Sequence, residues 1–410
     1  MNSKVTRIDD LACPRHTPAA LGVMAAAERE VIDMTVDAVL DAARAATGLA
    51  DFGAIDFVER LALMLRSADE DGLNGFGRRL FFNDMVRYAS NRLRVEDMVR
   101  RHPEILDVQI DRPIIILGMP RTGTTHLVNL IAADSRLRSM PYWESLTPVP
   151  PTGRPDTRLA DAEAGWAGLD ALLPMQKNVH ELSPTHIHEE IELQMLDFSS
   201  YMIEWTSRPY RWRDWYLSHD QTSSYHYLRK VLQLLTWLKG PNRWVLKSPG
   251  HLEQLGPLMA AFPDATVVMT HRDPAAVIAS CLTMNAYIDR LRRLKVDPAE
   301  VANYWVDRID RLLGACVRDR DILPADRSID VRFGDFMADQ MGTVERIYGL
   351  AGLEMTSDAA AAMQAYLEVH TRDRHGQLEY NLAHDFGVDP DALRKRFAFY
   401  SNRFLSDPAA

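Results

Sequence analysis

The sequence has little cysteine and no long apolar run. Its 410 residues include only three cysteines, Cys13, Cys281 and Cys316. Their odd number and wide spacing suit neither a disulfide framework nor a zinc site, so we expect reduced thiols in a cytoplasmic protein. The apolar runs are much shorter than the roughly 18 residues that a membrane-spanning helix needs. No apolar core follows a basic start, so we expect neither a membrane span nor a signal peptide.

Positive charge is also scarce. The chain has 47 Lys and Arg residues against 57 Asp and Glu residues, a formal net charge of −10. Proteins that bind nucleic acid usually carry a basic surface, so we expect no nucleic-acid partner. An anionic ligand would need local positive charge, and individual Arg and Lys residues therefore become informative.

The pattern of apolar residues divides the chain into two parts. Residues 1–105 predict a helical subdomain without catalytic spacing, with helices at Ala25–Ala46, Leu80–Asn91 and Val95–Arg101. Residues 106–410 alternate strand and helix patterns. This alternation predicts an α/β domain with a parallel β-sheet flanked by helices on both faces.

The stretch Pro113–Leu127 combines an apolar strand, a glycine-bearing loop and a helix. Gly118 and Gly123 stand five residues apart, as in loops that cradle nucleotide phosphates. Thr124 occupies the place of the lysine that contacts the phosphates in ATPases, and Arg121 is the nearest cation. We expect backbone N–H groups and the helix N-terminus to hold a phosphate here. The alternative is an ordinary strand-to-helix turn.

A second junction near residue 270 repeats this plan. An apolar strand ends at Arg272, and Asp273 and Pro274 suit the N-cap and first position of a helix. Ser280 follows Arg272 by eight residues, about two helical turns, and so lies near the same face. Ligands bind at this edge of parallel sheets, so the two junctions together predict two anion sites. For Arg272 alone, a surface arginine is the simpler interpretation.

The two junctions together resemble the sulfotransferases that use 3′-phosphoadenosine-5′-phosphosulfate (PAPS). Arg121-Thr-Gly-Thr-Thr125 resembles the family's loop for the 5′-phosphosulfate. Arg272 and Ser280 match its pair for the 3′-phosphate. Trp244–Pro249 and Asp385–Gly387 are similar to the bacterial branch, and the resemblance covers roughly residues 110–400.

This resemblance implies a P-loop-like fold and transfer of a sulfuryl group from PAPS to a hydroxyl or amine acceptor. PAPS would be the co-substrate and 3′,5′-diphosphoadenosine (PAP) the product, with no metal. The residues that it implies for cofactor binding are Arg121, Thr122, Gly123, Thr124, Thr125, His126, Arg272, Ser280, Phe333, Arg374 and Gly376.

The resemblance also implies catalytic roles. Arg121 would hold the charge on the leaving phosphate, and Lys247 would reach the bridging oxygen or the sulfonate. For the general base we favour Glu144, which follows Arg121 by 23 residues, much as a glutamate does in the tyrosylprotein branch. The neighbouring Glu189 and Glu190 form a rival pair, and His251 is a further rival base.

The segment His186-Ile-His-Glu-Glu190 is crowded with polar residues. His186, His188 and Glu190 do not share one helical face, so we expect no metal site. We interpret the segment, with an aromatic insert around residues 150–240, as lining for an acceptor pocket. The expected acceptor is a small molecule: an alcohol, carbohydrate, lipid or phenol.

Two other functions stay open at this point. A P-loop kinase or NTPase would use the same strand–loop–helix, but the missing lysine weighs against it. A non-catalytic nucleotide-binding scaffold would not need Arg121, Lys247, Arg272 and Ser280 together.

Overall fold

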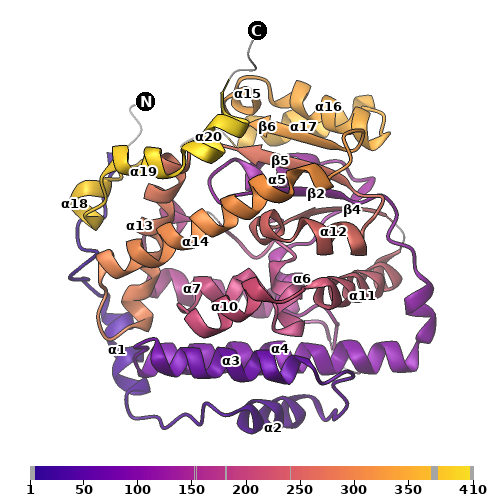
Figure 1. Cartoon of the computed structure of the whole chain (residues 1–410). Coiled ribbons are helices and arrows are strands. Elements are labelled where there is room, and N and C mark those ends of the chain that lie inside the picture. The colour runs from indigo at the N-terminus through magenta and orange to yellow at the C-terminus, as the bar shows by residue number, and fades with distance from the viewer. Residues whose placement is uncertain are drawn as a thin grey trace.

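The computed structural model describes residues 5–151, 153, 155–180, 182–240, 242–370 and 377–406. A five-stranded parallel sheet in the order β3-β4-β2-β5-β6 carries the fold (Figure 1). The expected α/β fold with helices around a parallel sheet is confirmed. The strands of this sheet are β2 (Ile114–Gly118), β3 (Leu137–Arg138), β4 (Arg243–Lys247), β5 (Thr266–His271) and β6 (Ser328–Arg332).

Strand β2 is buried on both faces, as its run of isoleucines predicts. Ile114 and Ile116 belong to one apolar cluster, and Ile115 and Leu117 belong to the other, because successive side chains of a strand point to opposite faces. The first cluster is completed by α5 (Thr124–Ile131), α16 (Gln340–Ala351) and α17 (Ser357–Val369). The second includes α11 (Thr222–Lys239), α12 (Leu255–Ala261), α13 (Pro274–Arg292) and α14 (Pro298–Asp319).

The N-terminal helices pack into the second cluster as well. In Figure 1, α3 and α4 run below the sheet, with α2 beyond them. The single helix expected over Ala25–Ala46 is wrong, because Thr35 starts a new helix by accepting a hydrogen bond from the Ala38 N–H at 3.3 Å. The division near residue 105 stays a prediction. The helices are α1 (Pro18–Ala27), α2 (Val36–Thr47), α3 (Phe57–Glu70) and α4 (Gly75–Arg101).

The two helices expected between residues 80 and 101 form one continuous helix, α4. Arg92 lies inside it and is 1% exposed. Its guanidinium donates to the Phe52 carbonyl at 2.9 Å and to the Asp197 carboxylate at 2.9 Å. This arginine connects the helix to two segments that are distant in the sequence.

A long connection from β3 to β4 forms a layer between α4 and the sheet (Figure 1). It holds α6 (Tyr142–Leu146), α7 (Arg158–Leu172), α8 (Gln176–Val179), α9 (Ile191–Gln194), the 3-10 helices η2 (Met195–Asp197) and η3 (Tyr201–Trp205), α10 (Tyr210–Ser218) and α11. The remaining elements are β1 (Val5–Thr6), β7 (Gln377–Leu378), α15 (Phe333–Ala338), α18 (Leu382–Phe386), α19 (Pro390–Arg396), α20 (Ala398–Phe404) and the 3-10 helices η1 (Pro103–Asp107), η4 (Pro249–Glu253) and η5 (Arg320–Ile322).

Gly118 closes β2 where two threonines approach. A Cβ atom at this position would lie 2.1 Å from the Thr270 Oγ1 and 2.8 Å from the Thr122 Oγ1. We expect Gly118→Ala to lower the free energy of unfolding by about 1–3 kcal/mol, the usual cost of overpacking. Gly165→Ala is the control, since a Cβ there meets nothing within 4 Å. Urea unfolding of both variants checks this, and equal stabilities would contradict it.

Candidate active site

The loop after β2 is held rigidly against the neighbouring strand. Thr122 is buried, and its Oγ1 lies 2.6 Å from both the Met119 carbonyl oxygen and the Thr270 Oγ1 of β5. Arg121 and Gly123 have left-handed backbones, with φ of 70° and 90°. The loop therefore turns sharply and presents the first turn of α5, whose N–H groups have no partner within the helix.

The side chain of Lys247 meets the start of α5. Lys247 ends β4 and is 3% exposed. Its Nζ donates to the Thr125 Oγ1 at 3.2 Å and forms an ion pair with the Glu189 carboxylate. The structure thus brings together the predicted cation, the first turn of α5 and a carboxylate from the segment before α9.

Glu190, next in the chain, is fully enclosed. Its Oε2 accepts from the backbone N–H of Lys247 at 2.7 Å, and its Oε1 lies 2.6 Å from the His251 Nε2. The other ring nitrogen of His251 lies 2.7 Å from the Tyr225 hydroxyl. Glu190 and His251 are 1% and 0% exposed. Glu190 and His251, two of the predicted rival bases, therefore satisfy each other inside the protein, where buried polar groups need partners.

Glu144 lies in α6 and is 1% exposed. Its carboxylate pairs with the Arg138 guanidinium at 2.6 Å and with the Lys239 ammonium at 2.8 Å. Arg138 in turn stacks over the Trp244 ring, with its guanidinium carbon 4.6 Å from the ring centroid. Two cations thus hold this carboxylate, and Lys247 is not one of them.

The second junction forms as the sequence predicts. Asp273 caps α13 by accepting from the Ala275 N–H at 3.0 Å, and Pro274 is the first helical residue. Arg272 donates from Nη1 to the Arg121 carbonyl oxygen at 2.7 Å. Its guanidinium carbon lies 4.3 Å from the centroid of the Phe333 ring. The two predicted anion junctions are therefore in direct contact.

Other predicted cofactor residues surround these contacts. Phe333 packs so close to Gly123 that a Cβ there would lie 3.2 Å from its ring. The Ser280 Oγ is 3.0 Å from the Tyr380 hydroxyl oxygen. The His126 Nε2 is 2.6 Å from the Gln340 Oε1, at the start of α16. Arg374 and Gly376 lie outside the described residues.

Three histidines lie close enough to Lys247 for its charge to lower their pKa values. Burial and the Lys247 charge lower the pKa of His180 to about 3 and that of His186 to about 4, and they hold the pKa of His188 well below its usual value. Asn129 donates to the His186 Nε2 at 2.9 Å. The His188 ring meets the Tyr142 ring edge-on, with centroids 4.7 Å apart. Imidazoles that are neutral near pH 7 therefore lie near the Lys247 charge, and the Tyr142 ring packs against one of them, His188.

Glu189 is one of the two neighbouring glutamates that the sequence suggested as rivals to Glu144 for the general base. Burial raises the pKa of its carboxyl, although the charge of Lys247 opposes this. The available signal was its position beside Glu190 in a polar segment expected to line the acceptor pocket. The pattern did not indicate which of the two glutamates contacts the Lys247 ammonium and which is enclosed.

Comparison with known proteins decides the family. The model of the Sulfotransferase family matches residues 113–358, more than half of the chain. The chain belongs to the sulfotransferase family.

Two solved mycobacterial sulfotransferases share its fold over nearly their whole length. STF9 from Mycobacterium avium matches with a TM-score of 0.82 and 27% identity, covering 92% of this chain and 98% of that chain. STF1 from Mycobacterium tuberculosis H37Rv matches with a TM-score of 0.75 and 30% identity, covering 89% and 98%. The omega-hydroxy-beta-dihydromenaquinone-9 sulfotransferase Stf3 of Mycobacterium bovis is 24% identical over 274 residues, which cover 63% of this chain and 68% of that protein. The predicted family and P-loop-like fold are confirmed.

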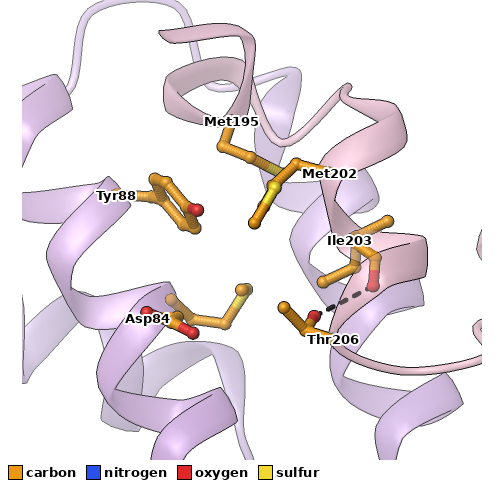
Figure 2. A pocket seen from close by; sticks show the side chains of 7 residues that line it. Asp84, Tyr88, Met195, Met202, Ile203 and Thr206 are labelled. Atoms are coloured by element: carbon orange, nitrogen blue, oxygen red, sulfur yellow. Dashed lines mark hydrogen bonds between the residues drawn. The ribbon is translucent and has the colours of Figure 1, made fainter. Parts of the chain in front are cut away.

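The sulfotransferase has a narrow crevice between α4 and the η2–η3 segment. Figure 2 shows Asp84 and Tyr88 on one side and Met195, Met202 and Thr206 on the other. The space between these side chains is too narrow to hold a water molecule. Tyr88 donates to the Glu192 Oε2 at 2.8 Å, so the crevice adjoins the segment that carries Glu189 and Glu190. We interpret this crevice as a gap in the packing of side chains and not as a ligand site.

The described residues offer neither a metal site nor a membrane-spanning helix. They contain no group of three or more His, Cys, Asp and Glu side chains arranged to hold a metal ion. None of their helices has the length and apolar character needed to cross a membrane.

The low pKa of His186 makes stability depend on pH. The folded pKa of about 4 lies below the unfolded value near 6.5, so the unfolded chain binds more protons between these values. Stability is then complete above about pH 6.5 and falls as the pH is lowered toward 4. We expect the loss in unfolding free energy from pH 7 to pH 5 to be about 1–2 kcal/mol smaller in His186→Asn. Urea titrations at both pH values test this, and identical losses would contradict it.

Proposed function

We propose that this sulfotransferase moves the sulfuryl group of PAPS to a hydroxyl group of a small organic acceptor and releases PAP. One observation carries the proposal: the buried Lys247 ammonium lies between the Thr125 hydroxyl and the Glu189 carboxylate, at the N-terminus of α5. A cation and helix N–H groups suit the donor phosphosulfate, and a carboxylate suits an acceptor proton.

The neighbouring strands support one nucleotide across both junctions. Gly118 pairs with Thr270 in the sheet, so the two loops leave it side by side. We infer that the loop from Arg121 to Thr125 binds the 5′-phosphosulfate. Arg272 and Ser280 bind the 3′-phosphate, and the Phe333 ring lies beside the nucleotide.

In the proposed reaction the acceptor oxygen attacks sulfur while the bond from sulfur to the phosphate oxygen breaks. Negative charge develops on that phosphate oxygen. Lys247, Arg121 and the N–H groups of α5 neutralise it, and fixed charges of this kind usually supply a large share of catalysis. The acceptor proton goes to a carboxylate on the opposite side of the sulfuryl group.

We infer that Glu189 takes this proton. Its carboxylate contacts the cation expected at the sulfuryl group, and burial raises its pKa toward the range useful for a base near neutral pH. Glu190 and His251 are within hydrogen-bond distance of each other. Glu190 also accepts from the Lys247 N–H, and His251 contacts the Tyr225 hydroxyl, so both side chains are already satisfied. Glu144 is paired with Arg138 and Lys239. In our proposal Glu144, Glu190 and His251 stabilise the structure of the site and do not take the proton.

We infer that the acceptor is an alcohol carried on an apolar molecule. The Tyr142 ring packs edge-on against the His188 and Trp166 rings, with centroids 4.7 and 6.0 Å away, beside the proposed base. Burial holds the nearby His186 and His188 rings in the neutral form near pH 7, so these two rings add no charge there. The name of the relative Stf3 describes a hydroxylated menaquinone derivative, an acceptor of this class.

Binding of PAP tests the donor. Because the loop lacks the phosphate-contacting lysine of ATPases, we expect PAP to raise the melting temperature without magnesium, since a ligand stabilises the folded state that binds it. ATP with magnesium should have a much smaller effect. Labelled sulfonate should pass from PAPS to a hydroxylated acceptor in a panel of lipids, sugars and phenols. Stabilisation by ATP and magnesium alone would instead support a nucleotide triphosphatase or kinase.

Glu189→Gln tests the base, because it keeps the shape of the side chain but cannot accept the proton. We expect the turnover rate to fall about 100- to 10,000-fold, the usual value of general base catalysis. PAP affinity, measured by calorimetry, should stay within a few fold. Glu368→Gln, at an exposed position of α17, is the matched control.

The same assay on Glu144→Gln, Glu190→Gln and His251→Ala tests the rivals. If Glu189→Gln turned over normally and one rival lost activity with its PAP affinity intact, that rival would be the base.

A further inference from the structure

The segment before α1 pairs with a strand near the other end of the chain. β1 (Val5–Thr6) and β7 (Gln377–Leu378) form a two-stranded parallel sheet, separate from the main one. The contact continues one residue further, because the Glu379 N–H donates to the Thr6 carbonyl at 2.9 Å. The backbone that leads into Tyr380 is therefore fixed by residues far away in sequence.

Arg7 fixes the same segment from its other end. Its Nη2 donates to the Asp385 Oδ1 at 2.6 Å and lies 2.9 Å from the His384 Nδ1. Both partners belong to α18, which begins and ends with Leu382 and Phe386, and these two side chains are buried in the large apolar cluster. In Figure 1, α18 lies near the first described residues of the chain. Residues 377–386 are thus anchored at both ends.

Tyr380 lies between these two anchors and reaches α13. Its hydroxyl oxygen is 3.0 Å from the Ser280 Oγ, and Ser280 is 5% exposed. A hydroxyl has one proton to donate and two lone pairs to accept with. When Ser280 donates its proton to a phosphate oxygen, the Tyr380 O–H can donate either to the Ser280 Oγ or to the phosphate itself.

We propose that Tyr380 is a further residue of the 3′-phosphate site, and that Arg7 and the β1–β7 pair hold it in reach. This inference rests on the proposed function, which supplies the 3′-phosphate. The ligand group is a phosphate monoester on the 3′ position of an adenine nucleotide. Tyr380 then adds a second hydroxyl beside Ser280, and it favours nucleotides that carry this group over those that lack it.

The first test compares two nucleotides by calorimetry on the full chain. Tyr380→Phe keeps the ring and removes only the hydroxyl. A hydrogen bond that serves a charged group is worth roughly tenfold in affinity, so the Kd for PAP should rise about 10-fold. The Kd for adenosine-5′-phosphosulfate, which has no 3′-phosphate, should change less than twofold. Tyr210→Phe is the matched control, since Tyr210 lies exposed in α10, and should leave both values unchanged.

A double-mutant cycle tests whether the two hydroxyls act together. Ser280→Ala and Tyr380→Phe should show coupled losses for PAP, because residues that share one ligand group are not independent. The combined variant should lose clearly less affinity than the product of the two single losses.

The second test concerns the anchor. Arg7→Ala should weaken PAP binding by roughly threefold, less than Tyr380→Phe, because it loosens the position of the hydroxyl without removing it. Arg15→Ala is the control: Arg15 also forms ion pairs in the N-terminal segment, with Asp9 and Asp10, but has none with α18. It should bind PAP like the wild type.

The outcomes separate this inference from the proposed function. Wild-type PAP binding with no loss in Tyr380→Phe would overturn the role of Tyr380 alone. Equal losses for PAP and adenosine-5′-phosphosulfate would mean that Tyr380 supports the fold, which also overturns it. A wild-type protein that binds neither nucleotide would overturn both.

Discussion

The buried carboxylate of Glu190 is the contact on which the arrangement of the site depends. A buried carboxylate must have hydrogen-bond partners for its oxygens. One oxygen of Glu190 takes the backbone N–H of Lys247 at the end of β4, and the other takes the His251 ring of η4. The hydrogen bond from the Lys247 N–H thus attaches the long connection between β3 and β4 to the last residue of β4. As a result the adjacent residue, Glu189, lies against the Lys247 side chain and forms an ion pair with it.

A second buried network, of ion pairs and hydrogen bonds, holds η4, the 3-10 turn that contains His251. Arg308 of α14 is 0% exposed and donates from Nη1 to Glu253 at 2.7 Å and from Nε to Glu204 at 2.8 Å. Glu253 closes η4, two residues after His251, and Glu204 lies in η3. Breaking such a buried pair by removing one partner is costly, because it leaves a charge uncompensated. The aromatic part of the insert and the turn that holds His251 are thus fixed to one helix.

The local sequence pattern was sufficient to predict many of the structural elements. The isoleucines of β2, the glycine-bearing loop and the capped start of α13 were all predicted, because burial, periodicity and capping act over a few neighbouring residues. The partners of Glu144 and the roles of Glu189 and Glu190 were not, since they depend on side chains from other parts of the chain. The same reason applies to α4, because the partners that Arg92 finds at residues 52 and 197 are distant in the sequence.

The hydrogen bond between Thr122 and Thr270 has a consequence for nucleotide choice. It joins the loop after β2 to the strand that ends beside Arg272, and adjacent strands lie about 4.8 Å apart. The Arg272 guanidinium also donates to the loop at Arg121. Neither anion site can therefore move without the other. Under the proposed assignment, the fixed spacing of the two loops selects a nucleotide by the separation of its two phosphate groups.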